Sequence, residues 1–253
     1  MKTLTLEEIG KMAGVSRSTV SRVLNNQANV SEDVRQKVKG IIKDTGFSPN
    51  TAARTLVSQK TYVIGLVIPQ TVQAFFADPY FARITQGIAQ ATNQNNYTLS
   101  LFLFDTQEVE NRLIPLITRP GFIDGLIVQA TSENDNVSSR ISNGTVPFIF
   151  AGRPMGHEEV NYIDVDNIRG AKIAVNHLAS LGKKRIGTIT GNLEISPGID
   201  RKTGYIEGLK ENNLPIDEDL IVEADFTQEG GYQAVEHLLK YKPDALFIAS
   251  DQM

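Results

Sequence analysis

Cysteine is absent from this chain of 253 residues. Its absence excludes a disulfide, a thiolate metal site, an iron–sulfur cluster and a cysteine nucleophile, and it is compatible with a reducing compartment. Long apolar runs are missing as well. The N-terminus, MKTLTLEEIG, lacks the apolar core of a signal peptide, and no stretch approaches the length of a membrane span. We therefore expect a cytoplasmic protein with no membrane partner.

Charge is distributed unevenly along the chain. Hydrophobic residues make up 41% and charged residues 21%, a balance typical of a folded globular protein. Residues 1–60 hold 10 Lys and Arg against 5 Asp and Glu, a net +5, whereas residues 61–253 hold 15 against 24, a net −9. A basic N-terminal region beside an acidic remainder indicates that the first region meets a polyanion, although a small basic domain can also simply be soluble.

Three short helices are predicted in the first 45 residues. Thr5 and Glu8 form a T-x-x-E capping box at the start of the first helix. Gly14 can adopt the left-handed conformation that ends this helix, and Ser16 can cap the next one. Ser31 is placed to cap a third helix. Two short helices joined by such a turn are typical of a helix-turn-helix, whose second helix enters the DNA major groove.

The second of these helices has two distinct faces. Val20, Val23 and Leu24 share an apolar sector on a helical wheel. The opposite sector carries hydrogen-bonding side chains and no acid: Arg17, Ser18, Ser21, Arg22 and Asn25. The missing acids favour DNA binding over a three-helix scaffold with a merely solvated polar face.

From residue 62 onward, apolar runs alternate with helical stretches. The runs are Tyr62–Ile68, Tyr97–Phe104, Gly125–Ala130, Phe148–Gly152, Ile186–Gly191 and Ala245–Ser250. The helical stretches lie near residues 79–95, 107–119, 168–181, 199–212 and 227–240. This alternation predicts a mostly parallel sheet covered on both faces.

No catalytic motif is present. The sequence contains no P-loop, no G-x-S-x-G and no H-E-x-x-H. His157 stands apart from His177 and His237, which fall late in predicted helices, where a structural role is favoured. We expect a protein that is not an enzyme and needs no cofactor or metal.

Three segments resemble one family closely. TLEEIGKMAGVSRSTVSRVLNN, VSEDVRQKV and FSPNTAARTL together resemble the head of the LacI/GalR family of bacterial transcription regulators. The resemblance extends over the remaining chain. It implies an α-helical helix-turn-helix DNA-binding head (1–48), a hinge helix and linker (49–61), and a periplasmic-binding-protein-like α/β effector domain with parallel sheets in two subdomains (62–253).

The resemblance also implies roles at matching positions of the head and hinge. Arg17, Ser18 and Arg22 match base-reading positions. The positions that touch phosphates or bases are Ser16, Thr19, Ser21 and Asn25. Asn50, at the start of the hinge, is a further DNA-binding position. Ala53 and Leu56 would enter the minor groove, with Leu56 opening the central base step. The alternative is that Leu56 packs on its own domain.

Effector-binding positions are implied in the same way. Phe75, Phe76 and Asp78 lie in the loop Pro69–Pro79, which borders the family's cleft, although both aromatic residues could instead cover the edge of a core. Arg201 matches an S-x-x-R-x-x-G-Y run whose arginine binds effector oxygen. The remaining candidates are Asp166, Ser250 and Asp251. A helix cap is favoured over ligand contact for Asp166.

The expected partners follow from the family. They are double-stranded operator DNA, a small-molecule effector such as a sugar or sugar phosphate, and a second copy of the chain, in a regulator that acts as a repressor. The family pattern continues beyond Met253, so we expect an effector domain that is incomplete at its C-terminus. The alternatives are a DNA-binding protein without effector sensing, a sugar-binding module, and an α/β enzyme such as a sugar kinase or hydrolase.

Overall fold

A computed structural model describes residues 4–48, 60–130, 136–156 and 159–253. The chain forms two compact units, Met1–Thr61 and Tyr62–Met253. Within the described residues, no helix is both long enough and apolar enough to cross a membrane.

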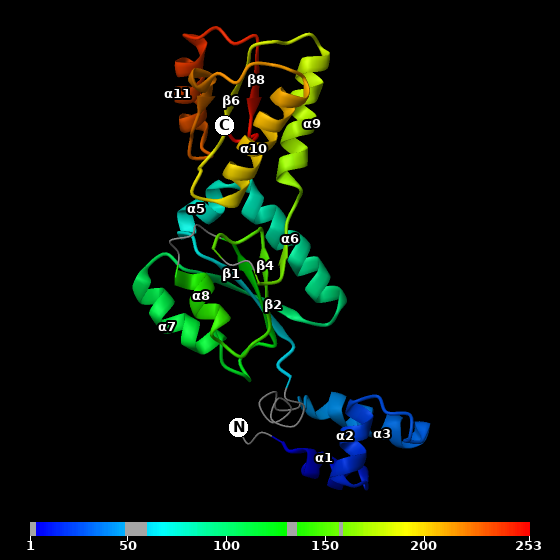
Figure 1. Ribbon diagram of the computed structural model, residues 1–253. Helices are drawn as coiled ribbons and strands as arrows, with labels where there is room; N and C mark the ends of the chain where they lie inside the picture. The colour runs from blue at the N-terminus through cyan, green and yellow to red at the C-terminus, as the bar shows by residue number, and fades with distance from the viewer. Residues whose placement is uncertain (1–3, 49–59, 131–135, 157–158) are drawn as a thin grey trace. The chain divides into compact units, whose positions relative to one another are not determined.

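The first unit contains three helices (Figure 1): α1 (Leu6–Ala13), α2 (Arg17–Leu24) and α3 (Glu32–Thr45). The predicted capping box is confirmed, because the Thr5 side chain accepts from the Glu8 amide and the Glu8 carboxylate accepts from the Thr5 amide at 2.8 Å. Gly14 ends α1 with φ of 69°, as predicted. Ser31 occupies the N-cap position of α3, but its side chain makes no capping hydrogen bond.

The core of the first unit lies where the three helices meet. Ile9, Val20 and Val38 are fully buried there, one from each helix. The apolar face predicted for α2 is therefore confirmed by Val20 and Val23, and burying it turns the polar face of the same helix outward.

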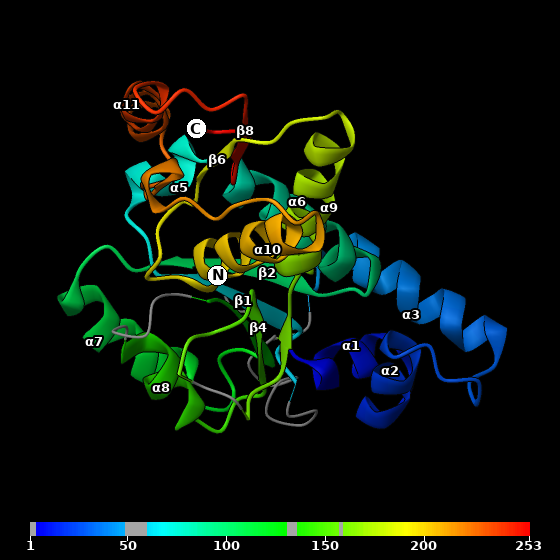
Figure 2. The ribbon, with the colours of Figure 1, turned by 45° about the horizontal axis from the view of Figure 1, so that its top comes forward.

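The larger sheet of the second unit has five parallel strands in the order β2-β1-β3-β4-β5. The strands are β1 (Val63–Ile68), β2 (Thr98–Leu103), β3 (Gly125–Gln129), β4 (Phe148–Ala151) and β5 (Tyr162–Ile163). Its helices are α5 (Val72–Ala77), α6 (Pro79–Gln94), α7 (Gln107–Ile117) and α8 (Asn136–Ser142). Figures 1 and 2 show α6 on one face of this sheet and α7 and α8 on the other.

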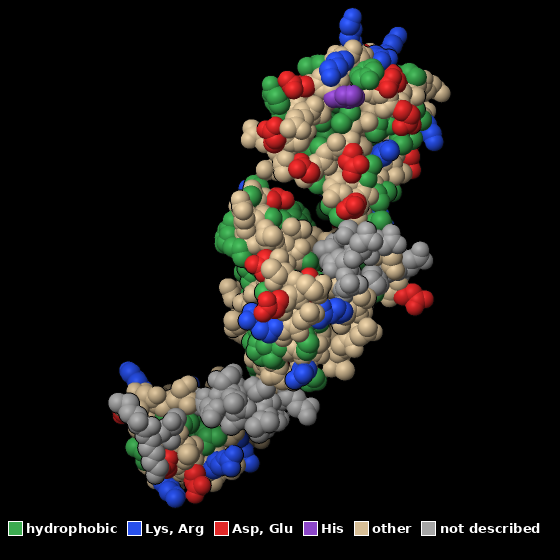
Figure 3. Space-filling model, turned by 90° about the vertical axis from the view of Figure 1, so that its left-hand side faces the viewer, with side chains coloured by type: hydrophobic (Ala, Val, Ile, Leu, Met, Phe, Trp, Pro, Cys, Tyr) green, Lys and Arg blue, Asp and Glu red, His purple; other side chains and the backbone are tan. Residues whose placement is uncertain are grey.

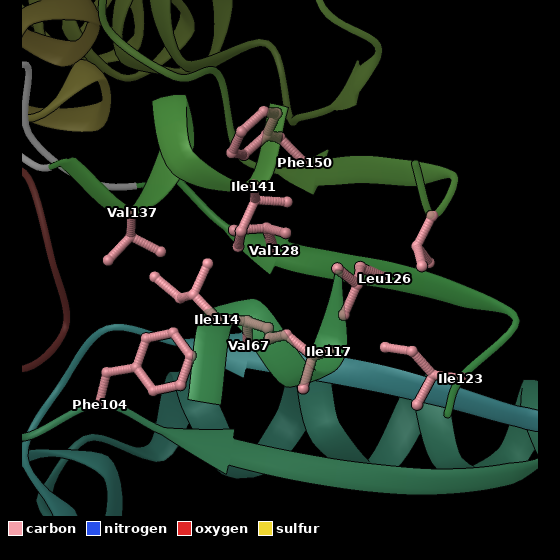
Figure 4. Packing of buried hydrophobic residues seen from close by; sticks show 11 residues of the cluster. Val67, Phe104, Ile114, Ile117, Ile123, Leu126, Val128, Val137, Ile141 and Phe150 are labelled. Carbon is pink, nitrogen blue, oxygen red and sulfur yellow. The ribbon is translucent and has the colours of Figure 1, made fainter. Parts of the chain in front are cut away.

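Alternate residues of β1 supply both cores of this sheet. Val67 faces α7 and α8, where it joins Ile114 and Ile141 in one buried cluster (Figure 4). Leu66 and Ile68 belong to a second cluster beside α5 and α6. Because both faces are covered, β1 is apolar almost throughout.

The smaller sheet has three parallel strands in the order β7-β6-β8. Its elements are α9 (Asn167–Ser180), β6 (Ile186–Ile189), α10 (Ser196–Glu211), the 3-10 turn η1 (Glu218–Leu220), β7 (Ile221–Val222), α11 (Gln228–Leu239) and β8 (Ala245–Ile248). Helices α9 and α10 cover one face and α11 covers the other.

The six predicted strands and five predicted helical stretches of this unit are all confirmed. The segment Pro69–Pro79, predicted as a loop, instead contains the short helix α5, which begins where the Thr71 side chain accepts from the Ala74 amide at 3.1 Å. Helix α8 and the two-residue strands β5 and β7 were also not predicted, because they are too short to show a period.

Helices α9 and α10 pack closely because α10 carries glycine at the contact. A Cβ on Gly204 would overlap the carbonyl oxygen of Ile168 and lie 2.8 Å from the Ala171 Cβ. The next residue, Tyr205, is fully buried, and its hydroxyl donates to the Ile186 carbonyl at 2.7 Å. Burial raises the pKa of Tyr205 to about 12, so the hydroxyl stays protonated as a donor.

We expect Gly204→Ala to lower the free energy of unfolding of the chain by about 1–3 kcal/mol, because the new methyl group overpacks the α9–α10 contact. The measurement is urea unfolding followed by far-ultraviolet circular dichroism. Gly170→Ala on α9 is the matched control: a Cβ there meets no atom within 4 Å, so stability should be unchanged or higher. Equal destabilisation by both variants would contradict the packing argument.

Candidate nucleic-acid interface and ligand cavity

The polar face of α2 is available to a partner. Arg17, Ser18 and Arg22 are exposed, together with the capping residue Ser16 and the C-terminal Asn25. Thr19 and Ser21 are half-buried at the margin of this face. Since α2 contains no acidic residue, the face offers hydrogen-bond donors and positive charge, the groups that contact phosphates and the acceptor edges of guanine.

Hydroxyl groups hold the first turn of α2 in place. The Ser16 side chain accepts from the Thr19 amide at 3.2 Å. Its oxygen also lies 2.7 Å from the Ser18 hydroxyl and 2.9 Å from the Thr19 hydroxyl. The helix N-terminus, which attracts anions, is thus preorganised together with two of the predicted contact residues.

Arg35 of α3 fixes the segment that follows α2. Its Nη2 donates to the Gln27 carbonyl at 2.7 Å and its Nη1 to the Asn26 side chain at 3.4 Å. Asn26 itself has φ of 52°, a conformation that asparagine tolerates better than most residues. Arg35 was not predicted from the sequence. Its place in α3 between the apolar residues Val34 and Val38 could have indicated a structural arginine.

The predicted hinge contacts Asn50, Ala53 and Leu56 lie outside the described residues. Their roles stay predictions.

We expect Ser16→Ala to destabilise α2 by about 1 kcal/mol, because it removes the side-chain cap of that helix. Hydrogen exchange of the α2 amides measures the loss. Ser31→Ala is the matched control, since Ser31 occupies an N-cap but makes no side-chain capping bond. The prediction fails if the two substitutions accelerate exchange of their own helices equally.

A cavity of about 1060 Å³ lies in the second unit. The larger sheet contributes Gln129 after β3, Gly152 after β4 and Asp164 after β5. The smaller sheet contributes Arg201 from α10 and Ser250 after β8. The cavity therefore lies at the carboxyl ends of the strands, where open α/β sheets bind ligands.

Arg201 is the central cation of this cavity. Its Nε donates to the Asn167 side chain at 2.9 Å and its Nη1 to the Ala249 carbonyl at 2.7 Å. Burial lowers the pKa of Arg201, while the nearby Asp164 raises it, and a guanidinium remains charged in either case. Two of its three nitrogens are thus anchored, whereas Nη2 makes no hydrogen bond to the described residues.

Aromatic side chains form two further walls. Phe226 has its ring centroid 6.0 Å from the Arg201 guanidinium carbon and covers Gly191, where any Cβ would overlap the ring. Phe226 also has φ of 65°, an uncommon value that such constraints can impose at a binding site. The Tyr80 hydroxyl donates to Gln129 at 3.2 Å, and burial raises its pKa, so the phenol is neutral.

Acidic side chains outnumber basic ones among the described lining residues. The acids are Asp78, Glu110, Asp164 and Glu194, and the bases are Arg83 and Arg201. Acidic side chains are also spread over the second unit on the face drawn in Figure 3. Such a cavity suits a neutral ligand better than an anion, because the field of the excess acids repels negative charge.

The structure brings only some of the predicted effector residues to the cavity. Asp78, Arg201 and Ser250 line it. Phe75 is buried in the core beside Leu66. This confirms the alternative prediction that Phe75 covers a core instead of bordering the cleft. The others lie outside the described lining: Phe76 is 77% exposed, Asp251 is exposed, and Asp166 caps α9 by accepting from the Arg169 amide at 2.9 Å.

Several lining residues were not predicted. Gln129 lies in the predicted strand Gly125–Ala130 and could have been sought at its end. Asp164 and Phe226 come after the unpredicted strands β5 and β7, and Tyr80 follows no strand, so these three carried no such signal. In the described part of the chain, no group of three or more His, Cys, Asp or Glu side chains could hold a metal ion. His177 and His237 are exposed late in α9 and α11, and His157 is outside the described residues.

Two family models match the chain. Residues 5–50 match bacterial regulatory proteins of the lacI family, and residues 61–253 match the periplasmic binding proteins and sugar binding domain of the LacI family. The HTH-type transcriptional regulator CelR of Thermobifida fusca is 36% identical over 98% of this chain and 74% of its own length. MalR of Streptococcus pneumoniae is 32% identical over 99% and 76%.

Solved structures agree. A CelR–cellobiose complex has a TM-score of 0.71 at 33% identity and covers 98% of this chain and 75% of that one. The lac repressor dimer bound to operator and the anti-inducer ONPF has a TM-score of 0.80 over 99% of this chain and 75% of that one. At 24% identity, the second likeness shows the fold alone.

Proposed function

Because the chain belongs to the LacI family of DNA-binding transcription regulators, we propose that it represses transcription by binding one operator sequence through α2, and that a neutral sugar in the cavity controls this binding. The observation that carries the proposal is the exposed, acid-free face of α2 in a basic unit. As a family regulator it is not an enzyme, and we place its action in the cytoplasm, where bacterial DNA is found.

The side chains of α2 divide the recognition of DNA between them. Arg17 and Arg22 can each hold O6 and N7 of a guanine, and Ser18 can bond to a base edge. The hydroxyls of Ser16, Thr19 and Ser21, and the Asn25 amide, fix the register on phosphates or bases. Two copies of the chain related by a two-fold axis would read a pseudo-palindromic operator.

We expect Arg22→Ala to weaken operator binding by about 1–3 kcal/mol and to relax the preference at one base position, because a bidentate base contact is lost. Selection of binding sites from random duplexes, followed by titration of the selected operator, measures both effects. Lys43→Ala removes one exposed positive charge from the last turn of α3 and should leave the base preference intact. An unchanged base preference in the Arg22 variant would contradict its role.

Operator affinity should also fall steeply as salt is added, because neutralised phosphates release counterions. Titrations at several salt concentrations measure the slope of log affinity against log salt. A flat dependence would contradict binding of DNA by the basic unit.

The cavity supports a neutral sugar as the effector. Arg201 and Ser250 offer hydrogen bonds to hydroxyl groups, and the Phe226 ring offers a flat apolar surface. A volume of about 1060 Å³ leaves room for more than a single sugar ring. The CelR relative in complex with cellobiose supports a saccharide, and the acidic excess argues for a neutral one rather than a sugar phosphate.

Calorimetry with cellobiose, maltose and glucose 6-phosphate tests this class. We expect a neutral disaccharide to bind and the phosphate not to bind, with at least a tenfold loss for Arg201→Lys, because the planar guanidinium fork is replaced by a point charge. Tight binding of glucose 6-phosphate would contradict the neutral effector. Specific operator binding without any saccharide binding would instead favour a DNA-binding protein that senses no effector.

A further inference from the structure

Arg153 bonds to both walls of the cavity without lining it. It follows β4 and Gly152, on the side of the larger sheet. Its amide donates to the Asp164 carboxylate at 2.9 Å, on that same side. Its carbonyl oxygen accepts from the Ser196 hydroxyl at 2.6 Å, and its guanidinium pairs with Asp200 at 2.5 Å.

Ser196 and Asp200 both belong to α10, which is part of the smaller sheet's layer. Ser196 lines the cavity and is buried, and Asp200 directly precedes Arg201. The Asp200 side chain is only 13% exposed, so its charge-assisted hydrogen bond is less screened than a surface pair.

We propose that Arg153 is a positioning residue of the effector cavity: by joining the end of β4 to the start of α10, it sets the separation between the Asp164 wall and the Arg201 wall. It acts through Asp164, Ser196 and Asp200 and does not touch the ligand. This role rests on the proposed effector function of the cavity.

The geometry explains why one residue has this effect. The amide bond orients Asp164, whereas the guanidinium and carbonyl bonds restrain α10 one helical turn apart, at residues 200 and 196. Removing the Arg153 side chain breaks only the guanidinium bond and leaves the largely buried Asp200 carboxylate without its cation. The two main-chain bonds stay, so the walls separate more often but remain linked.

The test measures wall separation in the full chain without any ligand. Because the chain has no cysteine, Asn111→Cys on α7 and Glu236→Cys on α11 give two unique, exposed spin-label sites, one in each sheet's layer. Pulsed electron resonance then gives the distribution of label distances. We expect Arg153→Ala and Asp200→Asn to raise the fraction of label distances outside the parent distribution about 2- to 5-fold. Arg153→Lys should restore most of the parent distribution.

Asp217→Asn is the matched control. It breaks the ion pair between Asp217 and Arg185, at 3.0 Å, which lies wholly within the smaller sheet's layer, and should leave the distance unchanged. Asp200→Asn keeps the side-chain shape, so it serves if Arg153→Ala does not fold. A parent-like distribution in Asp200→Asn and in folded Arg153→Ala would overturn the proposal, as would equal broadening by Asp217→Asn.

Cellobiose separates this proposal from the one on which it rests. In a calorimetric titration of the unlabelled full chain, the affinity for cellobiose should fall about 2- to 5-fold in Asp200→Asn relative to the parent. If the distances change as expected but neither cellobiose nor maltose binds the parent chain, the positioning role stands and the neutral disaccharide is wrong.

Discussion

Parallel strand pairing is the constraint on which the second unit depends. Parallel strands need crossover connections, and each strand therefore delivers the chain to the same edge of its sheet before a helix returns it. Both sheets obey this constraint, and their carboxyl edges contribute to one cavity through residues such as Gln129, Asp164 and Ser250. Binding groups can gather there because they stand at the ends of strands, where their side chains are not needed for the core.

Local interactions determine much of the first unit, which is why its helices could be predicted. Each helix signal depends on residues only a few positions apart in the sequence. Thr5 and Glu8 form the capping box, and Gly14 adopts the left-handed conformation that ends α1. Ser31 shows the limit: its residue type and position suit an N-cap, yet no side-chain bond forms. The rotamer of an exposed serine depends on competition with water, which the residue pattern does not record.

Strands and long helices of the second unit were equally predictable, because their apolar periods reflect burial on two faces. The cavity was predicted less well. Phe75 and Phe76 are neighbours in the sequence but point in different directions from α5, so that one is buried and the other is exposed. The family match identified Arg201, but nothing local signals that Tyr80 meets Gln129 across 49 positions. Such contacts arise from tertiary packing and are invisible to periodicity.

The opposite charges of the two parts of the chain give each a separate chemistry. Residues 1–60 carry a net +5 and residues 61–253 a net −9, so a polyanion is attracted to the first part and repelled by the second. Under the proposed function, this arrangement favours DNA contact through the basic region that contains α2 and disfavours contact through the acidic remainder. Under the proposed function, the excess of acid among the residues that line the cavity disfavours phosphate compounds and favours a neutral ligand. The distribution of charge therefore supports both proposed partners, the polyanion at the first part and the neutral ligand at the second.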